Sequence, residues 1–315
     1  MRWVRWRGSC IKTCRYRFSD GLMRRGRAIV FATAFELLCE PVFLLVLLAA
    51  LALSVLAPAM HYHQFGEASR MARDAGVSAI LVGGFAVALL GPVKTFRREL
   101  ETGTAQVALS HSVSRTSFFA CKTIGCALAY LIFAVAVSLT TLTVVNGAEI
   151  GGAIAAARGG MARLWGPSFA CAMSAIVLPL VLGALLNRFC RVRFAMSANL
   201  LALMFAFAGS IYRLDGHLAA RLMPVLVLSS IPAYAVLAAS AAFALRFRGN
   251  VAVALAAAVA VLLLPVLGNY CLSDALAYGG DLPLGYVLAA FVAFAPAVAI
   301  FVLAGVYFIN VQDVQ

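Results

Sequence analysis

The side chains best suited to binding or chemistry gather in one polar segment, Lys94–Lys122, which lies between two strongly apolar runs. Its charges form two groups: Lys94, Arg97, Arg98, Glu99 and Glu101 come first, and Arg115 and Lys122 follow. Gly103 and Thr104 stand between the groups, where glycine commonly breaks a helical pattern. The spacing predicts a helix, a break and a second short helix. No clean apolar stripe runs through the segment, so we expect it to lie along a membrane surface and to offer one face to another molecule.

The elements that must position this segment are membrane spans. Of the 315 residues, 64% are hydrophobic and 12% are charged, whereas soluble domains are about half apolar. A transmembrane helix needs about 20 apolar residues. Eight runs are long enough, near Pro41–Met60, Val77–Val93, Thr123–Val145, Gly166–Leu186, Ala195–Tyr212, Pro224–Leu245, Asn250–Gly268 and Leu284–Ile309. The sequence therefore predicts an all-α, polytopic membrane protein with about eight transmembrane helices.

The distribution of Lys and Arg predicts the orientation of these spans, since loops rich in both residues stay cytoplasmic. Threading from a cytoplasmic N-terminus places nineteen of the 25 Lys and Arg residues inside, and the 12 acidic residues divide equally between the two sides. The formal net charge of +13 then lies inside. We expect a multi-pass protein of the inner (cytoplasmic) membrane with both termini cytoplasmic. Its basic charge would meet anionic lipid headgroups rather than nucleic acid.

The region ahead of the first span predicts a helix in the interface plane. Within Leu22–Cys39, the apolar residues Ile29, Ala32, Phe35 and Leu38 recur at three-residue steps. The chain then turns inward at Glu40-Pro41, because proline disfavours helix at the preceding residue. The domains are therefore residues 1–39, a basic cytoplasmic N-terminus with an amphipathic interface helix, and residues 40–315, a single transmembrane domain that contains the segment 94–122.

The polar segment resembles the cytoplasmic coupling loop of type-2 ABC transporter permeases. The resemblance lies in Glu-x-x-x-Gly-Thr at residues 99–104, Ser-x-Ser-Arg at residues 112–115 and an aromatic-rich stretch that ends in Lys122. The stretch LPVLGNYCLSDALAYGGDLPLGYVLAAF is similar to the region before the last span of the same family. The family core usually has six spans, so Pro224–Leu245 and Asn250–Gly268 are interpreted as an inserted hairpin.

The resemblance implies a partner and a set of coupling residues. The partners would be a dimer of ATP-binding subunits and a second permease, either a copy of this chain or a paralogue. Glu99 and Glu101 would face the ATPase and Arg115 would anchor the return to the membrane. The residues implied in coupling are Arg98, Glu99, Glu101, Gly103, Thr104 and Arg115.

The sequence favours a non-enzymatic chain without a cofactor. None of the three lysines follows a glycine, so the Gly-Lys-Ser/Thr phosphate loop of an ATPase is absent. ATP hydrolysis is therefore expected in a separate subunit. The eight cysteines are scattered, which indicates reduced thiols, and neither Cys10-x-x-x-Cys14 nor His61-Tyr62-His63 has the further ligands of a metal site.

Two features of the spans predict packing rather than substrate binding. Gly83, Gly84, Ala88 and Gly91 form a small-residue face for close helix contact. Asn199, the most polar residue of the fifth predicted span, is expected to hydrogen-bond a neighbouring helix.

Taken together, these patterns favour a permease subunit of an ATP-driven exporter with an unidentified substrate. One alternative is a structural or sensory membrane protein without transport activity. Another is a secondary transporter, which the lack of an ionisable residue clearly inside a span disfavours. An intramembrane protease is disfavoured because His-Glu-x-x-His and Gly-x-Ser-x-Gly motifs are missing.

Overall fold

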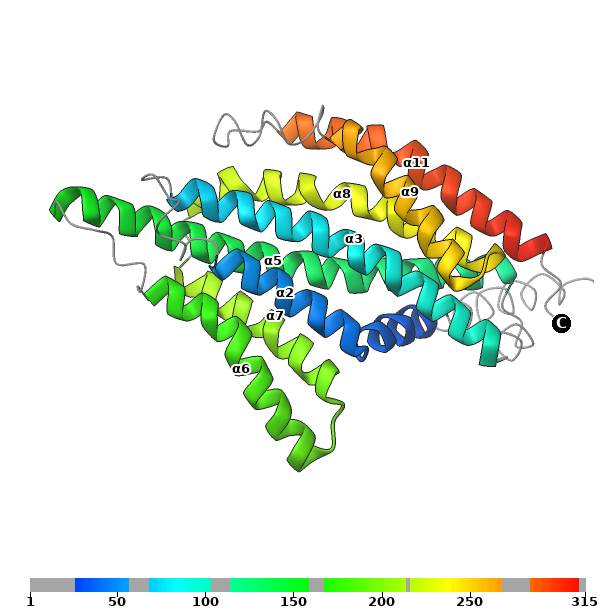
Figure 1. Ribbon diagram of the computed structural model, residues 1–315, viewed down its shortest axis with the longest axis horizontal. Helices are drawn as coiled ribbons and strands as arrows, with labels where there is room; N and C mark the ends of the chain where they lie inside the picture. The colour runs from blue at the N-terminus through cyan, green and yellow to red at the C-terminus, as the bar shows by residue number, and fades with distance from the viewer. Residues whose placement is uncertain are drawn as a thin grey trace, which may run out of the picture.

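The computed structural model describes residues 26–56, 68–102, 114–158, 167–213, 216–267 and 284–311, and these residues are almost entirely helical and contain no β-strand (Figure 1). Each of the eight predicted spans corresponds to one helix. In chain order these are α2 (Pro41–Leu56), α3 (Ala68–Thr102), α5 (Arg115–Arg158), α6 (Pro167–Cys190), α7 (Phe194–Arg213), α8 (Gly216–Arg246), α9 (Gly249–Leu267) and α11 (Leu284–Val311). The predicted all-α, polytopic membrane fold is confirmed.

Helix length separates the eight helices into two groups. Six are long and apolar enough to cross a membrane, namely α3, α5, α6, α7, α8 and α11. The helix α2 has 16 residues, and at about 1.5 Å per residue it extends about 24 Å, short of a hydrocarbon core of about 30 Å. Within the described residues, the apolar part of α9, Gly249–Leu263, is also short. The described helices thus provide six spans, or seven when α2 counts together with the helix before it.

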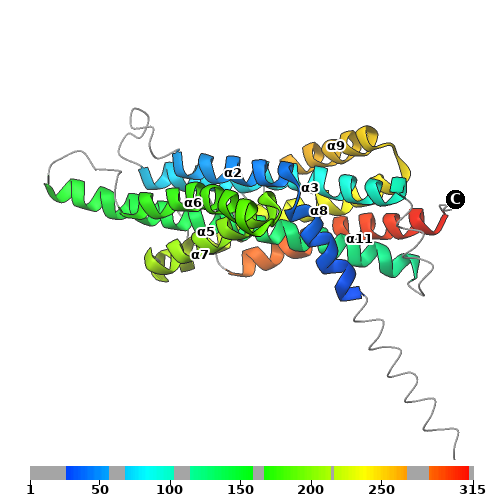
Figure 2. The same cartoon turned by 90° about the horizontal axis from the view of Figure 1, so that it is seen from below.

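The predicted interface helix is present as Gly26–Leu38, and it meets α2 at 67° (Figure 2, dark blue). The bend falls at the predicted Glu40-Pro41. Pro41 has no N–H to donate within a helix, yet its fixed φ suits the first position of α2. The apolar residues that recur at three-residue steps do not share one face of this helix, because Leu38 is buried in the bundle whereas Phe35 is exposed.

Helices α3, α5 and α8 form the centre of the bundle. They pack against one another, with α2, α6 and α7 on one side and α9 and α11 on the other (Figure 1). Most of the apolar window of each central helix is buried, whereas α6 and α11 are mostly exposed and would face lipid. The hairpin α8–α9, interpreted from the resemblance as an insertion, therefore supplies a core helix.

The small-residue face of α3 is a packing face, as predicted. A Cβ on Gly83 would lie 2.6 Å from the Cζ atom of Phe133, and a Cβ on Gly84 would lie 3.1 Å from the ring of Tyr130. Both aromatic residues belong to α5 and are fully buried. The glycines thus allow α3 and α5 to approach closely, and any larger side chain would separate them.

Asn199 on α7 hydrogen-bonds another helix, as predicted. Its Nδ2 donates to the backbone carbonyl of Leu38 at 2.8 Å, and the side chain is fully buried. Leu38 is the last residue of the interface helix, where carbonyl groups lack partners within the helix. Asn199 therefore caps the interface helix at the bend before α2.

Several segments far apart in the sequence meet at one end of the bundle. Arg98 contacts Glu36 of the interface helix, Arg97 donates to the carbonyl of Phe247 between α8 and α9, and Arg115 donates to the carbonyl of Asn310 near the end of α11. The end of α3, the start of α5, the α8–α9 turn and both ends of the described chain thus lie together. We call this the charged end of the bundle.

Candidate functional site

The two helical parts of the predicted coupling segment are ends of long helices rather than separate short helices. Lys94–Thr102 is not a separate helix but the last turns of α3, which runs without a break from Ala68. Arg115–Lys122 is likewise the start of the 44-residue helix α5. Gly103 and Thr104 lie outside the described residues. Long helices therefore connect the polar segment directly to the centre of the bundle.

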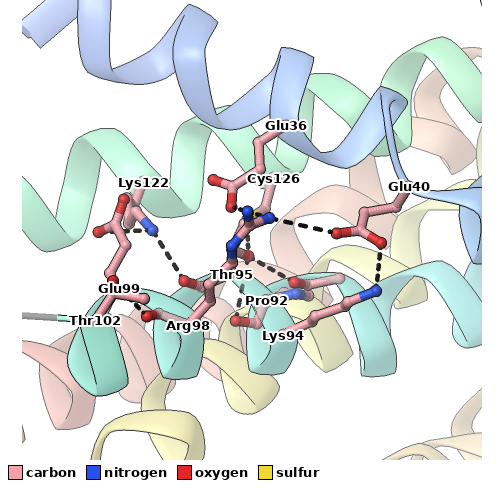
Figure 3. Close-up of polar contacts among 11 residues, drawn as sticks. Glu36, Glu40, Pro92, Lys94, Thr95, Arg98, Glu99, Thr102, Lys122 and Cys126 are labelled. Carbon is pink, nitrogen blue, oxygen red and sulfur yellow. Dashed lines mark hydrogen bonds and ion pairs between the residues drawn. The ribbon is translucent and has the colours of Figure 1, made fainter. Parts of the chain in front are cut away.

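A buried ion pair joins α3 to α5 at the charged end. Lys122 Nζ lies 2.8 Å from Glu99 Oε2, and the Lys122 side chain is only 1% exposed (Figure 3). The ammonium group also donates to the carbonyl of Thr95 at 3.2 Å, and it lies over the rings of Phe96 and Phe118 at 5.2 and 5.9 Å from their centroids. These contacts compensate the loss of hydration that burial of the charge costs. The Glu99 oxygen accepts no well-aligned hydrogen bond, so the charge of Lys122 is its main support.

A second group of charges joins α3 to the interface helix and to α2. Arg98 Nη1 lies 3.4 Å from Glu36 Oε1 and 3.7 Å from Glu40 Oε1, and Lys94 pairs with the other oxygen of Glu40 (Figure 3). Glu40 is largely covered, whereas Lys94 and Arg98 are half exposed, at 50% and 57%. The two cations thus hold the bend between the interface helix and α2 against α3.

The electrostatic environment of Glu36 reflects its place between these two groups. Glu36 lies in the interface helix, outside the predicted spans. Burial raises the pKa of its carboxyl group, the charge of Lys122 opposes that shift, and Glu99 adds to it. Proximity to Lys122 and Glu99 makes Glu36 part of the same cluster. We therefore define the charged cluster as Glu36, Glu40, Lys94, Arg98, Glu99 and Lys122.

Two other predicted coupling residues lie within the described part of the chain, Glu101 and Arg115. Glu101 is 64% exposed and pairs with Arg97 one turn earlier on α3, at 2.8 Å. Arg97 also donates to the carbonyl of Phe247 at 3.2 Å. Arg115 donates to the carbonyl of Asn310 at 3.5 Å, so it ties α5 to α11. The role of Arg115 in anchoring the return to the membrane stays a prediction.

The expectation that Glu99 and Glu101 share one outward face does not fit this geometry. Residues two apart on an α-helix point about 200° from each other, so the two acids cannot share one face. Glu99 faces Lys122, and Glu101 is the acid that another molecule could contact. The two-residue spacing is visible in the sequence and could have excluded a shared face.

Four residues of the cluster lie outside the predicted set of coupling residues: Glu36, Glu40, Lys94 and Lys122. The sequence offers a weak signal for the first two, since Glu36 and Glu40 are four residues apart in a strongly apolar region. No local signal pairs Lys122 with Glu99, because the two belong to different helices.

A groove of about 530 Å³ lies beside the charged cluster, between α2, α3 and the start of α9. Its apolar wall includes Phe43, Val46, Ala86, Val87, Leu90 and Val253. Its charged rim consists of Glu40, Lys94, Arg97, Arg98 and Glu101. The groove therefore has an apolar half and a charged half, and the two meet near Val93.

The described residues present no group of three or more His, Cys, Asp or Glu side chains that could hold a metal ion. Five cysteines fall within them, Cys39, Cys121, Cys126, Cys171 and Cys190, and all five are free. Cys10, Cys14, His61 and His63 lie outside the described residues.

The fold and this site define an integral membrane protein whose bundle carries a charged cluster and an amphipathic groove at one end. No family model, curated protein or solved structure matches the chain.

Proposed function

We propose that this chain is the membrane-spanning subunit of an ATP-driven transporter, of the kind that the type-2 ABC permease resemblance implies. It would pair with a second permease, a copy or a paralogue, and act with a dimer of ATP-binding subunits. The transporter would export its substrate across the inner membrane, with the charged end cytoplasmic. The basic residues of that end support this orientation, since loops rich in Lys and Arg stay inside.

The observation that carries this proposal is the continuity of α3 and α5 from the charged end to the core. Each helix runs unbroken past its apolar stretch, and the Lys122–Glu99 pair locks the two together at that end. A push on the end of α3 would therefore move both helices as one unit. Close packing of α3 and α5 at Gly83 and Gly84 would pass this motion into the membrane.

The outward-facing Glu101 is the residue that we expect to meet the ATPase. Charge pairs at a partly desolvated interface couple by about 1.5–7 kcal/mol, whereas exposed pairs contribute about 1 kcal/mol or less. Reversing a docking charge would therefore weaken the complex far more than it would destabilise the fold.

The test is purification of the tagged chain from the membranes of its own host. An ATP-binding subunit with a phosphate loop should co-purify in a stoichiometric complex that hydrolyses ATP, whereas the isolated chain should neither bind nor hydrolyse it. Glu101→Lys should reduce both the recovery of the subunit and ATP hydrolysis at least tenfold. The matched control is Arg188→Glu, another exposed charge reversal, located in the last turn of α6.

Two results would refute the proposal. The first is stoichiometric binding of ATP by the isolated chain. The second is a complex whose assembly and ATP hydrolysis respond equally to Glu101→Lys and to the control.

The buried Lys122–Glu99 pair also favours a second candidate, a proton-coupled secondary transporter. Such transporters use buried ionisable groups as relays, and this pair weakens the sequence-based argument that no such group exists. In that case the purified chain alone, in vesicles, would move substrate on a proton gradient, and a protonophore would abolish transport. Transport that needs ATP and the second subunit would exclude it.

A further inference from the structure

The groove beside the charged cluster changes character at the expected depth of the membrane boundary. On α3 the apolar run ends at Val93, and Lys94 is the next charged residue. Phe43, Ala86 and Leu90 line the groove on the apolar side of this boundary, whereas Lys94 and Arg98 line it on the other. One molecule in the groove would therefore meet hydrocarbon at one end and the headgroup layer at the other.

The charged rim is complementary to an anion. It carries three cations, Lys94, Arg97 and Arg98, and two carboxylates, Glu40 and Glu101, and Arg98 pairs in addition with Glu36 beside the groove. A lysine ammonium has three N–H donors and a guanidinium has five. The ion pairs of Arg98 both use Nη1, and Lys94 pairs with one oxygen of Glu40. Both side chains are half exposed, whereas Glu40 is covered, so the rim presents more donors than acceptors.

The start of α9 adds further donors at the same place. Gly249 and Asn250 line the groove, and they are the first residues of a 19-residue helix. The first N–H groups of a helix have no partner within it, and they favour anions. Arg97 packs at this point, since a Cβ on Gly249 would lie 3.2 Å from its Cδ. Arg97 and the start of α9 thus adjoin each other, and both line the same groove as Lys94.

We propose that the groove binds one membrane phospholipid with an anionic headgroup. An acyl chain lies along Phe43, Ala86 and Leu90, and the phosphate lies between Lys94, Arg97 and the start of α9. The volume is within the range of about 300–1,000 Å³ that is typical of small-molecule sites. This proposal goes beyond transport, since the lipid would bind with or without an ATP-binding subunit.

Photo-crosslinking tests the proposal on the full-length protein in mild detergent. The probe is phosphatidylglycerol with a diazirine in one acyl chain, and the labelled peptides are identified by mass spectrometry. We expect labelling to concentrate on α2 around Phe43 and on α3 around Ala86 and Leu90. Phosphatidylcholine with the same diazirine chain should label these peptides much less. Inorganic phosphate should not compete, because it lacks the chain that the apolar wall binds.

Variants separate the charged and apolar contributions. Lys94→Gln and Arg97→Gln should each reduce labelling by phosphatidylglycerol about fivefold, equivalent to about 1 kcal/mol for each cation near anionic lipid. Lys94→Arg should keep most of it. Leu90→Trp should block the groove while its added bulk remains partly exposed. The controls are Arg188→Gln on α6 and Leu262→Trp on the exposed face of α9, and neither residue lines the groove.

Three results would overturn the proposal. Labelling spread evenly over exposed residues such as Leu262 and Val292 would indicate only the surrounding lipid. Equal labelling by phosphatidylcholine would remove the role of the charged rim. Unchanged labelling in Leu90→Trp, with elution of the variant as folded protein, would remove the groove itself.

Discussion

At the scale of single residues, the Lys122–Glu99 pair has the highest electrostatic cost in the charged cluster. Breaking a buried pair by removing one partner costs about 3–5 kcal/mol, because the remaining charge stays buried. Lys122 is almost fully covered, whereas Glu99 is 25% exposed and can recruit water. The two residues are therefore not equivalent, and substituting Glu99 or Lys122 should change the stability of the protein by different amounts.

We predict that Glu99→Gln destabilises the protein more than Lys122→Met does. Loss of Glu99 leaves a buried ammonium group, whereas loss of Lys122 leaves a carboxylate that reaches solvent. The double variant Glu99→Leu with Lys122→Met should recover much of the stability, since apolar replacement of a buried pair is often neutral. Thermal unfolding in detergent, followed by size-exclusion chromatography, measures the order. The exposed pair gives the control, since Glu101→Gln should cost about 1 kcal/mol or less.

Asn199 provides a second prediction at this scale. Asn199→Leu should destabilise the protein by about 1–3 kcal/mol, because the carbonyl of Leu38 would lose its buried donor. The same unfolding experiment measures the change. Asn250→Leu, an exposed asparagine at the start of α9, is the matched control and should have a smaller effect on stability. Equal losses in both variants would contradict the capping role.

At the scale of elements, the interface helix depends on a close approach to α5. A Cβ on Gly125 would lie 2.7 Å from both the carbonyl oxygen of Val30 and the Cβ of Thr33. The backbone of Val30 cannot move aside as a flexible side chain can. A larger residue in place of Gly125 must therefore displace the interface helix. The interface helix is therefore positioned by α5 as much as by its own apolar stripe.

A disulfide reporter tests this contact. A Cβ at Gly26 would lie 3.3 Å from the sulfur of Cys121, so Gly26→Cys should form a disulfide with Cys121 on mild oxidation. Adding Gly125→Leu should reduce the yield several-fold, because the helix moves away. The disulfide-linked peptide is quantified by mass spectrometry with the other cysteines replaced by serine. Gly285→Leu is the control, since no atom lies within 4 Å of its added Cβ, and an equal loss there would contradict the displacement.

At the scale of the whole molecule, the structure brings the end of α3, the start of α5, the α8–α9 turn and the end of α11 together at the charged end. The contacts of Arg97 with Phe247 and of Arg115 with Asn310 show this directly. The side of the membrane that this end faces is a prediction from the distribution of Lys and Arg.

Single-cysteine labelling in intact cells checks the orientation. Cys190 is exposed at the end of α6 and is predicted to be cytoplasmic, whereas Cys271 falls in a predicted outside loop. An impermeant thiol reagent should label a chain with only Cys271 and should leave a chain with only Cys190 unlabelled until the cells are opened. The reverse pattern would invert the orientation, and with it the proposed place of the ATPase.

The sequence alone determined the features that depend on local chemistry. The length of each apolar run predicts a helix, and within the described residues each of the eight runs is helical. Pro41 predicts the bend before α2, because proline lacks the N–H group that a helix interior needs, whatever the tertiary context. The packing role of Gly83 and Gly84 and the interhelical bond of Asn199 also follow from residue type, since small residues permit contact and a buried amide needs a partner.

Only the tertiary structure decided how the charges are used. In sequence Glu99 and Glu101 look alike, yet the packing of α3 on α5 turns one toward Lys122 and leaves the other exposed. Glu40 meets Lys94 across 54 positions of the chain. The groove likewise needs three helices to exist. The sequence pattern of one segment predicts whether that segment is a helix. Ion pairs and grooves depend on how each helix is rotated about its axis relative to its neighbours, and only tertiary packing determines that rotation.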